Sequence, residues 1–168
     1  MIPTSGKIHK LNTGLVTACV VGLALSYYAY YVETSKEKDS NYEPLCDISE
    51  HVSCTKAFMS KYGKGYGLIS EDSIFYLPNS LYGLGFYGLV AIISVCNKYS
   101  HAVFLLILAV LSNIGTVYLT WILHLLNDIC IVCVGTYTVN AIILILSYSK
   151  YRIISKPIIQ RSAKRKRH

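Results

Sequence analysis

Four long stretches of this chain contain no Asp, Glu, Lys or Arg, and they restrict its possible folds more than any other feature. The stretches are residues 11–32, 73–97, 99–127 and 129–149. Each is long enough to cross a bilayer, which takes about 17 to 25 apolar residues in a helix. Pro78 and Asn79 interrupt the second stretch, so its helix should begin near residue 80.

We therefore predict an all-α membrane protein built as a bundle of four transmembrane helices. The predicted helices cover about 11–32, 80–97, 101–126 and 129–149. The composition agrees, because 53% of the residues are hydrophobic and 15% are charged. An ordinary soluble domain carries about 25% charged residues.

The distribution of charge predicts how the bundle is oriented. Of the Lys and Arg residues, two precede the first helix, one lies between the second and third helices, and eight follow the fourth. Eight of the nine acidic residues lie in segment 33–79, and the ninth is Asp128. Since basic residues stay on the cytosolic side, both termini should be cytosolic. Segment 33–79 should form a luminal loop or cap, with 150–168 as a cytosolic tail, all within one domain, 1–168.

The basic tail accounts for most of the formal net charge of +7. Because it follows a membrane helix, we do not expect a nucleic-acid partner. Residues 164–168, Lys-Arg-Lys-Arg-His, resemble the dibasic retrieval signal of endoplasmic reticulum membrane proteins. The alternative is a basic patch attracted to anionic lipids, which would leave the orientation unchanged.

A CxxC pair, Cys130 and Cys133, stands at the entrance to the last apolar stretch. Two thiols at this spacing can close into one disulfide and so take up or release two electrons. Asp128 precedes them where an N-cap would stand, which predicts a helix that begins at the cysteines. A short loop around residues 127–128 should join the last two helices as a hairpin.

Two further cysteines, Cys46 and Cys54, fall in the predicted luminal loop on the same side as the CxxC pair. One alternative is that both pairs are static disulfides in a membrane adaptor. Another is a zinc site, although the Cys46–Cys54 interval is wider than ordinary zinc-knuckle spacing, so we expect no metal. Thiol–disulfide exchange between the two pairs is the interpretation we favour, because it needs one mobile and one fixed pair.

Three polar residues are candidates for contacts near the CxxC thiols. Tyr137 follows Cys133 by four residues and shares its helix face, and Asn79 stands at the mouth of the second helix. Both can donate hydrogen bonds into an apolar pocket. The alternative is that Asn79 only caps its helix and Tyr137 packs in the bundle. His124 is a proton donor, an interior hydrogen-bonding residue or a residue at the membrane interface. The loop also holds a glycine run at 63–67, read as a turn, and a short amphipathic helix within 47–61.

The chain resembles the vitamin K epoxide reductase family of the endoplasmic reticulum from about Ser26 to His168. The matching motifs are Leu45-Cys46-Asp47, Ser53-Cys54 with Phe58, Gly63-Lys-Gly-Tyr-Gly-Leu68, Pro78-Asn79-Ser80, Val117-Tyr-Leu-x-Trp-Ile-Leu123 and Asp128-x-Cys-Ile-Val-Cys-x-x-Thr-Tyr137. The resemblance implies a four-helix membrane bundle that encloses a quinone beneath a luminal cap. It implies an endoplasmic reticulum membrane location and sensitivity to coumarin-type inhibitors such as warfarin. Tyr62 departs from the tryptophan of many vertebrate members, and His124 matches no family role.

The resemblance also implies roles for individual residues. Cys130 and Cys133 would be the catalytic pair, with Cys133 beside the quinone. Cys46 and Cys54 would relay electrons from a luminal thioredoxin-like protein. The substrate would contact Asn79, Tyr137 and Phe58.

The implied activity is reduction of vitamin K 2,3-epoxide and of the quinone, with redox-active disulfides and no permanently bound cofactor. The alternative activity is that of a quinone-linked oxidase of luminal protein thiols that supports disulfide formation, since the same thiols could serve either activity.

Overall fold

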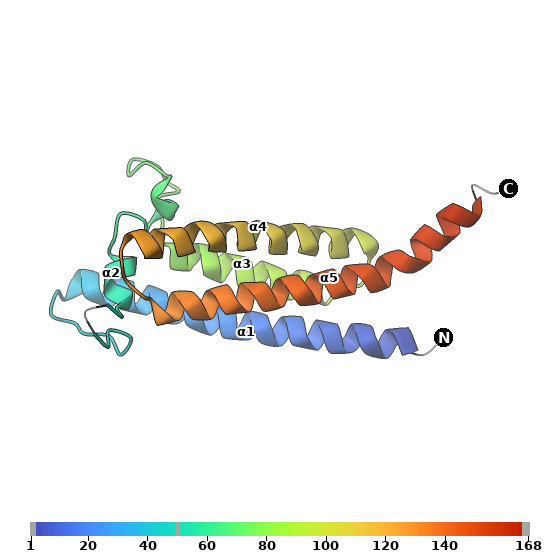
Figure 1. The fold of residues 1–168 in the computed structure, drawn as a ribbon, viewed down its shortest axis with the longest axis horizontal. Coiled ribbons are helices and arrows are strands. Elements are labelled where there is room, and N and C mark those ends of the chain that lie inside the picture. Colours follow the sequence, from blue (N-terminus) through green and yellow to red (C-terminus); the bar gives the residue numbers. More distant parts are fainter. Residues whose placement is uncertain (1–2, 50, 166–168) are drawn as a thin grey trace.

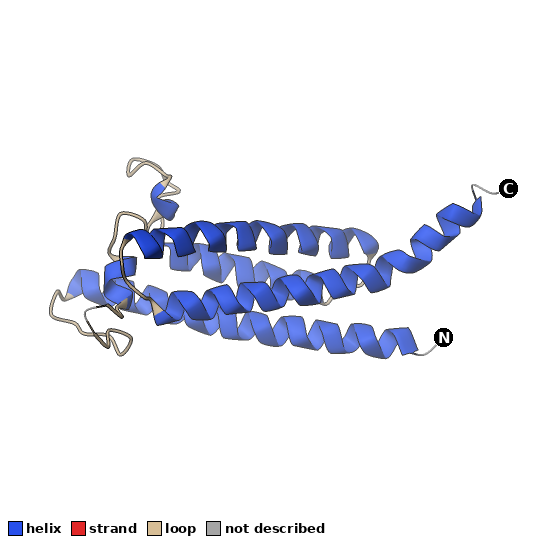
Figure 2. Ribbon diagram, viewed as in Figure 1, coloured by secondary structure: helices blue, strands red, loops and turns tan. Residues whose placement is uncertain are grey.

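The computed structural model describes residues 3–49 and 51–165, with side chains from residue 5 to residue 156 apart from residue 50. The described residues form helices and loops and contain no strand, which confirms the all-α prediction. The elements are α1 (Pro3–Lys38), α2 (Cys54–Phe58), the 3-10 turn η1 (Gly65–Gly67), α3 (Asn79–Ser94), α4 (Tyr99–Leu125) and α5 (Ile131–Arg165). Helices α1, α3, α4 and α5 run side by side, and α2 lies with the loops at one end (Figure 1). Helices dominate the whole length of the molecule (Figure 2).

Three of the helices are long and apolar enough to cross a membrane. They are Ser5–Lys38, Tyr99–Leu125 and Ile131–Lys156. The remaining predicted span, 80–97, is the shorter helix α3 of 16 residues. It ends at Ser94 because the next residues turn toward α4. Large apolar side chains face outward on α4, among them Ile114, Val117 and Trp121. Such a surface suits lipid rather than water.

Glycines let α1 and α3 approach each other closely. A Cβ atom on Gly22 would lie 2.5 Å from the Tyr87 ring, and one on Gly83 would lie 2.5 Å from Ser26 Oγ. Small residues at helix contacts are typical of membrane bundles, where close packing replaces the hydrophobic effect between helices. Helix α5 packs against both α1 and α4, which completes the bundle.

The two chain ends lie at one end of the bundle, and α2 with its loops lies at the other (Figure 1). The sequence predicts that the last transmembrane helix ends at residue 149, but α5 continues through Arg165. A basic segment can remain helical after it leaves an apolar environment, so the charge pattern marks the end of the apolar part rather than of the helix. Residues 166–168 of the predicted retrieval signal lie outside the described residues.

A buried lysine closes the end of α3. Lys150 is 0% exposed, and its Nζ donates to Ser94 O over 2.6 Å and to Cys96 O over 2.9 Å. The last carbonyl groups of a helix have no partner within it. Lys150 of α5 therefore provides the hydrogen-bond donors that the carbonyl groups at the end of α3 lack within their own helix.

We predict that Lys150→Met destabilises the bundle by about 3 kcal/mol, because two buried carbonyls lose a charged hydrogen-bond donor. The thermal unfolding midpoint in detergent should fall accordingly. Lys156→Met is the matched control, since Lys156 is exposed on the same helix. Equal midpoints for the two variants would show that the carbonyls do not depend on the amine.

Candidate active site

A short backbone pairing joins the loop after α1 to the start of α5. Ser53 N donates to Ile129 O over 3.1 Å, and Ile129 N donates to His51 O over 2.9 Å, around a parallel bridge between Val52 and Ile129. Because Cys54 and Cys130 each follow a paired residue, the pairing brings these two cysteines together. It also explains why the predicted helix within 47–61 is limited to Cys54–Phe58, since the residues before it are extended.

Two disulfides lie at this end of the bundle, Cys46–Cys54 and Cys130–Cys133. Cys54 and Cys130 are both 0% exposed, and Cys46 is 6% exposed. These three cysteines belong to one buried apolar cluster with Ala29 and Val32 of α1, and Cys133 packs against it. The structure therefore brings all four predicted redox cysteines into one region.

Asp47 organises the first disulfide. Its Oδ1 accepts hydrogen bonds from Ser53 Oγ at 2.9 Å, Cys54 N at 2.6 Å and Thr55 N at 3.0 Å. Burial raises the pKa of this carboxyl group, but these hydrogen bonds outweigh it, and the pKa lies below its usual value. Cys46, Asp47 and Cys54 are also the potential metal-ligand cluster found among the described residues, but its two sulfur atoms are joined to each other.

The turn between α4 and α5 confirms the predicted hairpin and corrects the predicted cap. Asn127 adopts the left-handed conformation (φ 50°), Asn127 N donates to His124 O, and Asp128 N donates to Leu123 O. This is a Schellman motif, which ends α4. Both carboxylate oxygens of Asp128 are buried without a partner among the described residues, so the N-cap prediction is wrong.

Cys130 takes the capping position instead. Helix α5 begins at Ile131, and Cys130 Sγ accepts a hydrogen bond from Cys133 N over 3.2 Å. The helix starts late because Ile129 is held extended by its pairing with the loop. The sulfur of Cys130 thus lies at a helix N-terminus, where backbone N–H groups stabilise negative charge.

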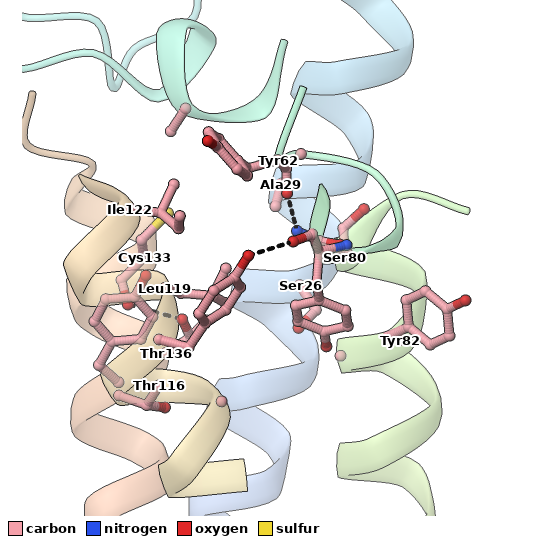
Figure 3. Close-up of a pocket in the computed structure, with 18 of the residues that line it drawn as sticks. Ser26, Ala29, Tyr62, Ser80, Tyr82, Thr116, Leu119, Ile122, Cys133 and Thr136 are labelled. Atoms are coloured by element: carbon pink, nitrogen blue, oxygen red, sulfur yellow. Dashed lines mark hydrogen bonds between the residues drawn. The ribbon is translucent and has the colours of Figure 1, made fainter. Parts of the chain in front are cut away.

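A cavity of about 660 Å³ lies among helices α1, α3, α4 and α5, beneath the loop. Cys133 lines it, together with Leu119, Ile122, Thr136 and further apolar and aromatic side chains, whereas Cys130 does not (Figure 3). Ligand sites are usually apolar clefts of about this size with a few polar groups. The two sulfurs of the CxxC pair therefore have different surroundings: Cys133 lines the cavity, and Cys130 lies in the buried cluster with the Cys46–Cys54 disulfide.

The three predicted substrate contacts, Phe58, Asn79 and Tyr137, all line this cavity. The hydroxyl group of Tyr137 makes no hydrogen bond to any residue in the described part of the chain. His124, by contrast, is exposed on α4 and does not line the cavity. The structure thus brings the first three residues together with Cys133 and leaves His124 apart.

The amide of Asn79 holds the loop over the cavity. Its Nδ2 donates to Tyr62 O over 2.6 Å, and its Oδ1 accepts from Tyr66 N over 2.9 Å. Tyr66 has a left-handed backbone (φ 57°), and its carbonyl accepts from Tyr118 Oη over 3.1 Å. One Nδ2 hydrogen of Asn79 has no partner in these two bonds. Gly65 and Gly67, on either side of Tyr66, have positive φ, which confirms the turn predicted for the glycine run.

Sequence reasoning missed two polar groups in the cavity wall. At one place Tyr87 Oη donates to Asn140 Oδ1 over 3.0 Å, and Asn140 Nδ2 donates to Thr116 Oγ1 over 2.9 Å. At another, Ser80 Oγ donates to Glu33 Oε2 over 3.3 Å. Two sequence signals would have identified these groups: Asn140 lies within an apolar stretch, and Glu33 lies at the end of another.

This arrangement can carry two electrons from one disulfide to the next and on to a molecule in the cavity. Exchange requires a thiolate near a disulfide sulfur, which the shared cluster provides. The apolar walls favour a lipid-soluble acceptor, and Tyr137 and Asn79 offer hydrogen bonds to an oxygen atom on it.

Comparison with known proteins gives an independent view of this site. The sequence model of the vitamin K epoxide reductase family matches residues 14–148. Vitamin K epoxide reductase complex subunit 1 of Mus musculus is 38% identical over 146 residues, which cover 83% of this chain and 91% of the relative. The protein of the same name from Rattus norvegicus is 36% identical over 137 residues, which cover 79% and 85%.

We predict that the two CxxC thiols react at different rates once reduced. A small lipid-soluble maleimide should modify Cys133 on the order of tenfold faster than Cys130, because only Cys133 lines the cavity. Timed quenching and mass spectrometry of the peptides would measure both rates. Cys19, buried and outside the cavity, should stay unmodified while the protein is folded. Equal rates at Cys130 and Cys133 would contradict the assignment.

Proposed function

Because the chain belongs to the vitamin K epoxide reductase family, we propose that it reduces vitamin K 2,3-epoxide to the quinone and the quinone to the hydroquinone. Membership makes the protein an oxidoreductase of this kind. The observation that carries the finer proposal is the position of Cys133, which belongs to a disulfide and also lines an apolar cavity of about 660 Å³.

The proposed electron path uses both disulfides in turn. A reduced thioredoxin-like protein first reduces the Cys46–Cys54 bond. The Cys54 thiolate then attacks Cys130 Sγ, so a Cys54–Cys130 bond forms and Cys133 leaves as a thiolate. Cys46 next attacks Cys54, which restores the first disulfide and frees Cys130. The two electrons of the partner now reside on the CxxC pair. The shared cluster of Cys46, Cys54 and Cys130 supports this order.

The epoxide step uses the reduced pair. The Cys133 thiolate attacks a ring carbon of the epoxide, a C–S bond forms, and a C–O bond breaks to leave an alkoxide that takes up a proton. Cys130 then attacks the sulfur of Cys133, the C–S bond breaks, and its electron pair returns to the ring and expels the oxygen as water. One epoxide and two thiols thus give one quinone, one disulfide and one water.

Tyr137 and Asn79 stabilise the alkoxide in this scheme. The free hydroxyl group of Tyr137 and the remaining Nδ2 hydrogen of Asn79 both lie in the cavity wall. Hydrogen-bond donors that are already oriented in a dry site lower the barrier when an oxyanion forms. Phe58 forms part of the apolar wall against which the ring would pack.

We further propose that the whole chain is one domain with four membrane spans and that segment 33–79 is a luminal cap. Helix α3, at 16 residues, is about 24 Å long, which a bilayer accommodates by local thinning. The termini lie together at the end opposite the cap (Figure 1), as expected if both are cytosolic. With the basic tail, this arrangement supports a location in the endoplasmic reticulum membrane, with the termini in the cytosol.

The luminal partner would dock beside Cys46. Its neighbours Leu45 and Ile48 are 92% and 67% exposed, which gives a partner an apolar surface next to the first disulfide. Coumarin-type inhibitors would compete for the cavity, where Tyr62 forms part of the wall. Both the reductase and the alternative thiol oxidase pass electrons from thiols to a quinone, so turnover of the epoxide, which only the reductase requires, separates the two activities.

We predict that Cys133→Ala abolishes dithiothreitol-driven turnover of vitamin K epoxide in microsomes. Cys46→Ala and Cys54→Ala should retain it, because a small reductant reaches the CxxC pair directly. With a thioredoxin-like protein as the only reductant, these two variants should also lose activity. Full activity of Cys133→Ala would refute the assignment of this thiol, and inactive Cys54→Ala with dithiothreitol would refute the relay.

We also predict that Tyr137→Phe lowers kcat for the epoxide about 100-fold, because the alkoxide loses a donor. The rate is read from single turnovers of pre-reduced protein, followed by chromatography of the substrate. Tyr148→Phe is the control, since Tyr148 is exposed on the same helix and lies outside the cavity. Unchanged kcat in Tyr137→Phe would remove this residue from the mechanism.

A further inference from the structure

Glu33 is a carboxyl group in the cavity wall that the mechanism above does not use. It lies near the end of α1, is 3% exposed and lines the cavity. Ser80 donates to its Oε2, while its Oε1 is buried and has no hydrogen-bond partner among the described residues. A buried polar atom without a partner is costly, so such an atom beside a cavity indicates a ligand that completes it.

The charges around Glu33 leave it without an ionic partner in the described part of the chain. The nearby cation is Lys64, whose Nζ instead pairs with Glu37 Oε1 over 2.6 Å. A carboxyl group in apolar surroundings with no ionic partner is more stable as the neutral acid than as the anion. In that form it carries a proton that it can donate.

Glu33 also faces the cavity from the side away from the reactive thiol. Its hydrogen-bond partner Ser80 belongs to α3, whereas Cys133 belongs to α5, and the two lie on opposite sides of the cavity (Figure 3). A quinone has an oxygen atom at each end of its ring. If one end lies near Cys133, the other therefore points toward the side that holds Glu33 and Ser80.

We propose that Glu33 donates a proton to the substrate oxygen that lies farther from Cys133. This inference rests on the proposed function, because it assigns a residue to the quinone step. Two electrons pass to the quinone as the Cys130–Cys133 bond forms, and each quinone oxygen gains a proton. One thiol proton reaches the near oxygen and the other is released to water. Glu33 protonates the far oxygen and regains a proton from water, so the protons balance.

The first test is a single turnover of the pre-reduced full-length protein with menadione, a naphthoquinone without a long tail, over a range of pH. Glu33→Gln should lower kcat about 100-fold with little change in KM, since general acids contribute about 10²- to 10⁴-fold. Because the acid must be protonated, the wild-type rate should fall as pH rises through its ionisation, and Glu33→Gln should lose that fall.

Other titratable groups near Glu33 must be separated from it in this test. They are Glu37 on α1, Tyr62, Lys64 and Tyr66 in the loop, Tyr82 and Tyr87 on α3, Tyr118 on α4, and Cys133 and Tyr137 on α5. Glu43→Gln is the matched control, an exposed acid in the loop that does not line the cavity, and it should keep the wild-type rate and profile. If Glu33→Gln keeps both as well, the inference is overturned.

A second test does not need turnover. Infrared difference spectra of wild-type protein with and without menadione should show the carbonyl band of a protonated carboxyl group shifting on binding. The shift should persist in Glu43→Gln and vanish in Glu33→Gln. Absence of a shift in bound wild-type protein would overturn the inference even if Glu33→Gln fails to fold. If the shift is present but neither epoxide nor quinone is reduced, the proposed function fails while the contact to Glu33 stands.

Discussion

The site depends on the backbone pairing of segment 51–53 with Ile129. The segment between α1 and α3 contains no long helix in its described part and is too short to build a core of its own. The Cys46–Cys54 disulfide and the Asp47 hydrogen bonds shape it locally, but neither attaches it to the bundle. The pairing does so, and it places Cys54 in the same buried cluster as Cys130, as the proposed exchange requires.

The two cysteines of the CxxC pair have different surroundings because helix α5 begins between them. Cys130 precedes α5 and lies in the buried cluster, whereas Cys133 is within the first turn and lines the cavity. In the proposed relay, attack on the disulfide at Cys130 would release Cys133 toward the cavity. The first turn of α5 would then separate the sulfur that receives electrons from the sulfur that passes them on.

The long helices could be predicted because an uncharged apolar stretch can be recognised from local composition alone. Helices α1, α4 and α5 each contain such a stretch. The actual N-cap of α5, Cys130, could not be predicted, because the pairing of Ile129 with a distant loop delays the start of the helix beyond Asp128. The family resemblance located Cys133, Phe58, Asn79 and Tyr137, all of which line the cavity. It did not locate Glu33 or the Tyr87–Asn140 bond, because their partners come from other helices. Asn79 was expected to contact substrate, and its bonds to the loop were visible only in three dimensions.

The two bonds of the Asn79 amide couple the covering loop to whatever occupies the space below. Nδ2 and Oδ1 already hold the backbone at Tyr62 and Tyr66, and one hydrogen is left over. A bound molecule that accepts this hydrogen would fix the amide plane and, through it, the backbone at Tyr62 and Tyr66. Binding in the cavity would then order the covering loop at these two residues, and loss of the bound molecule would free them again.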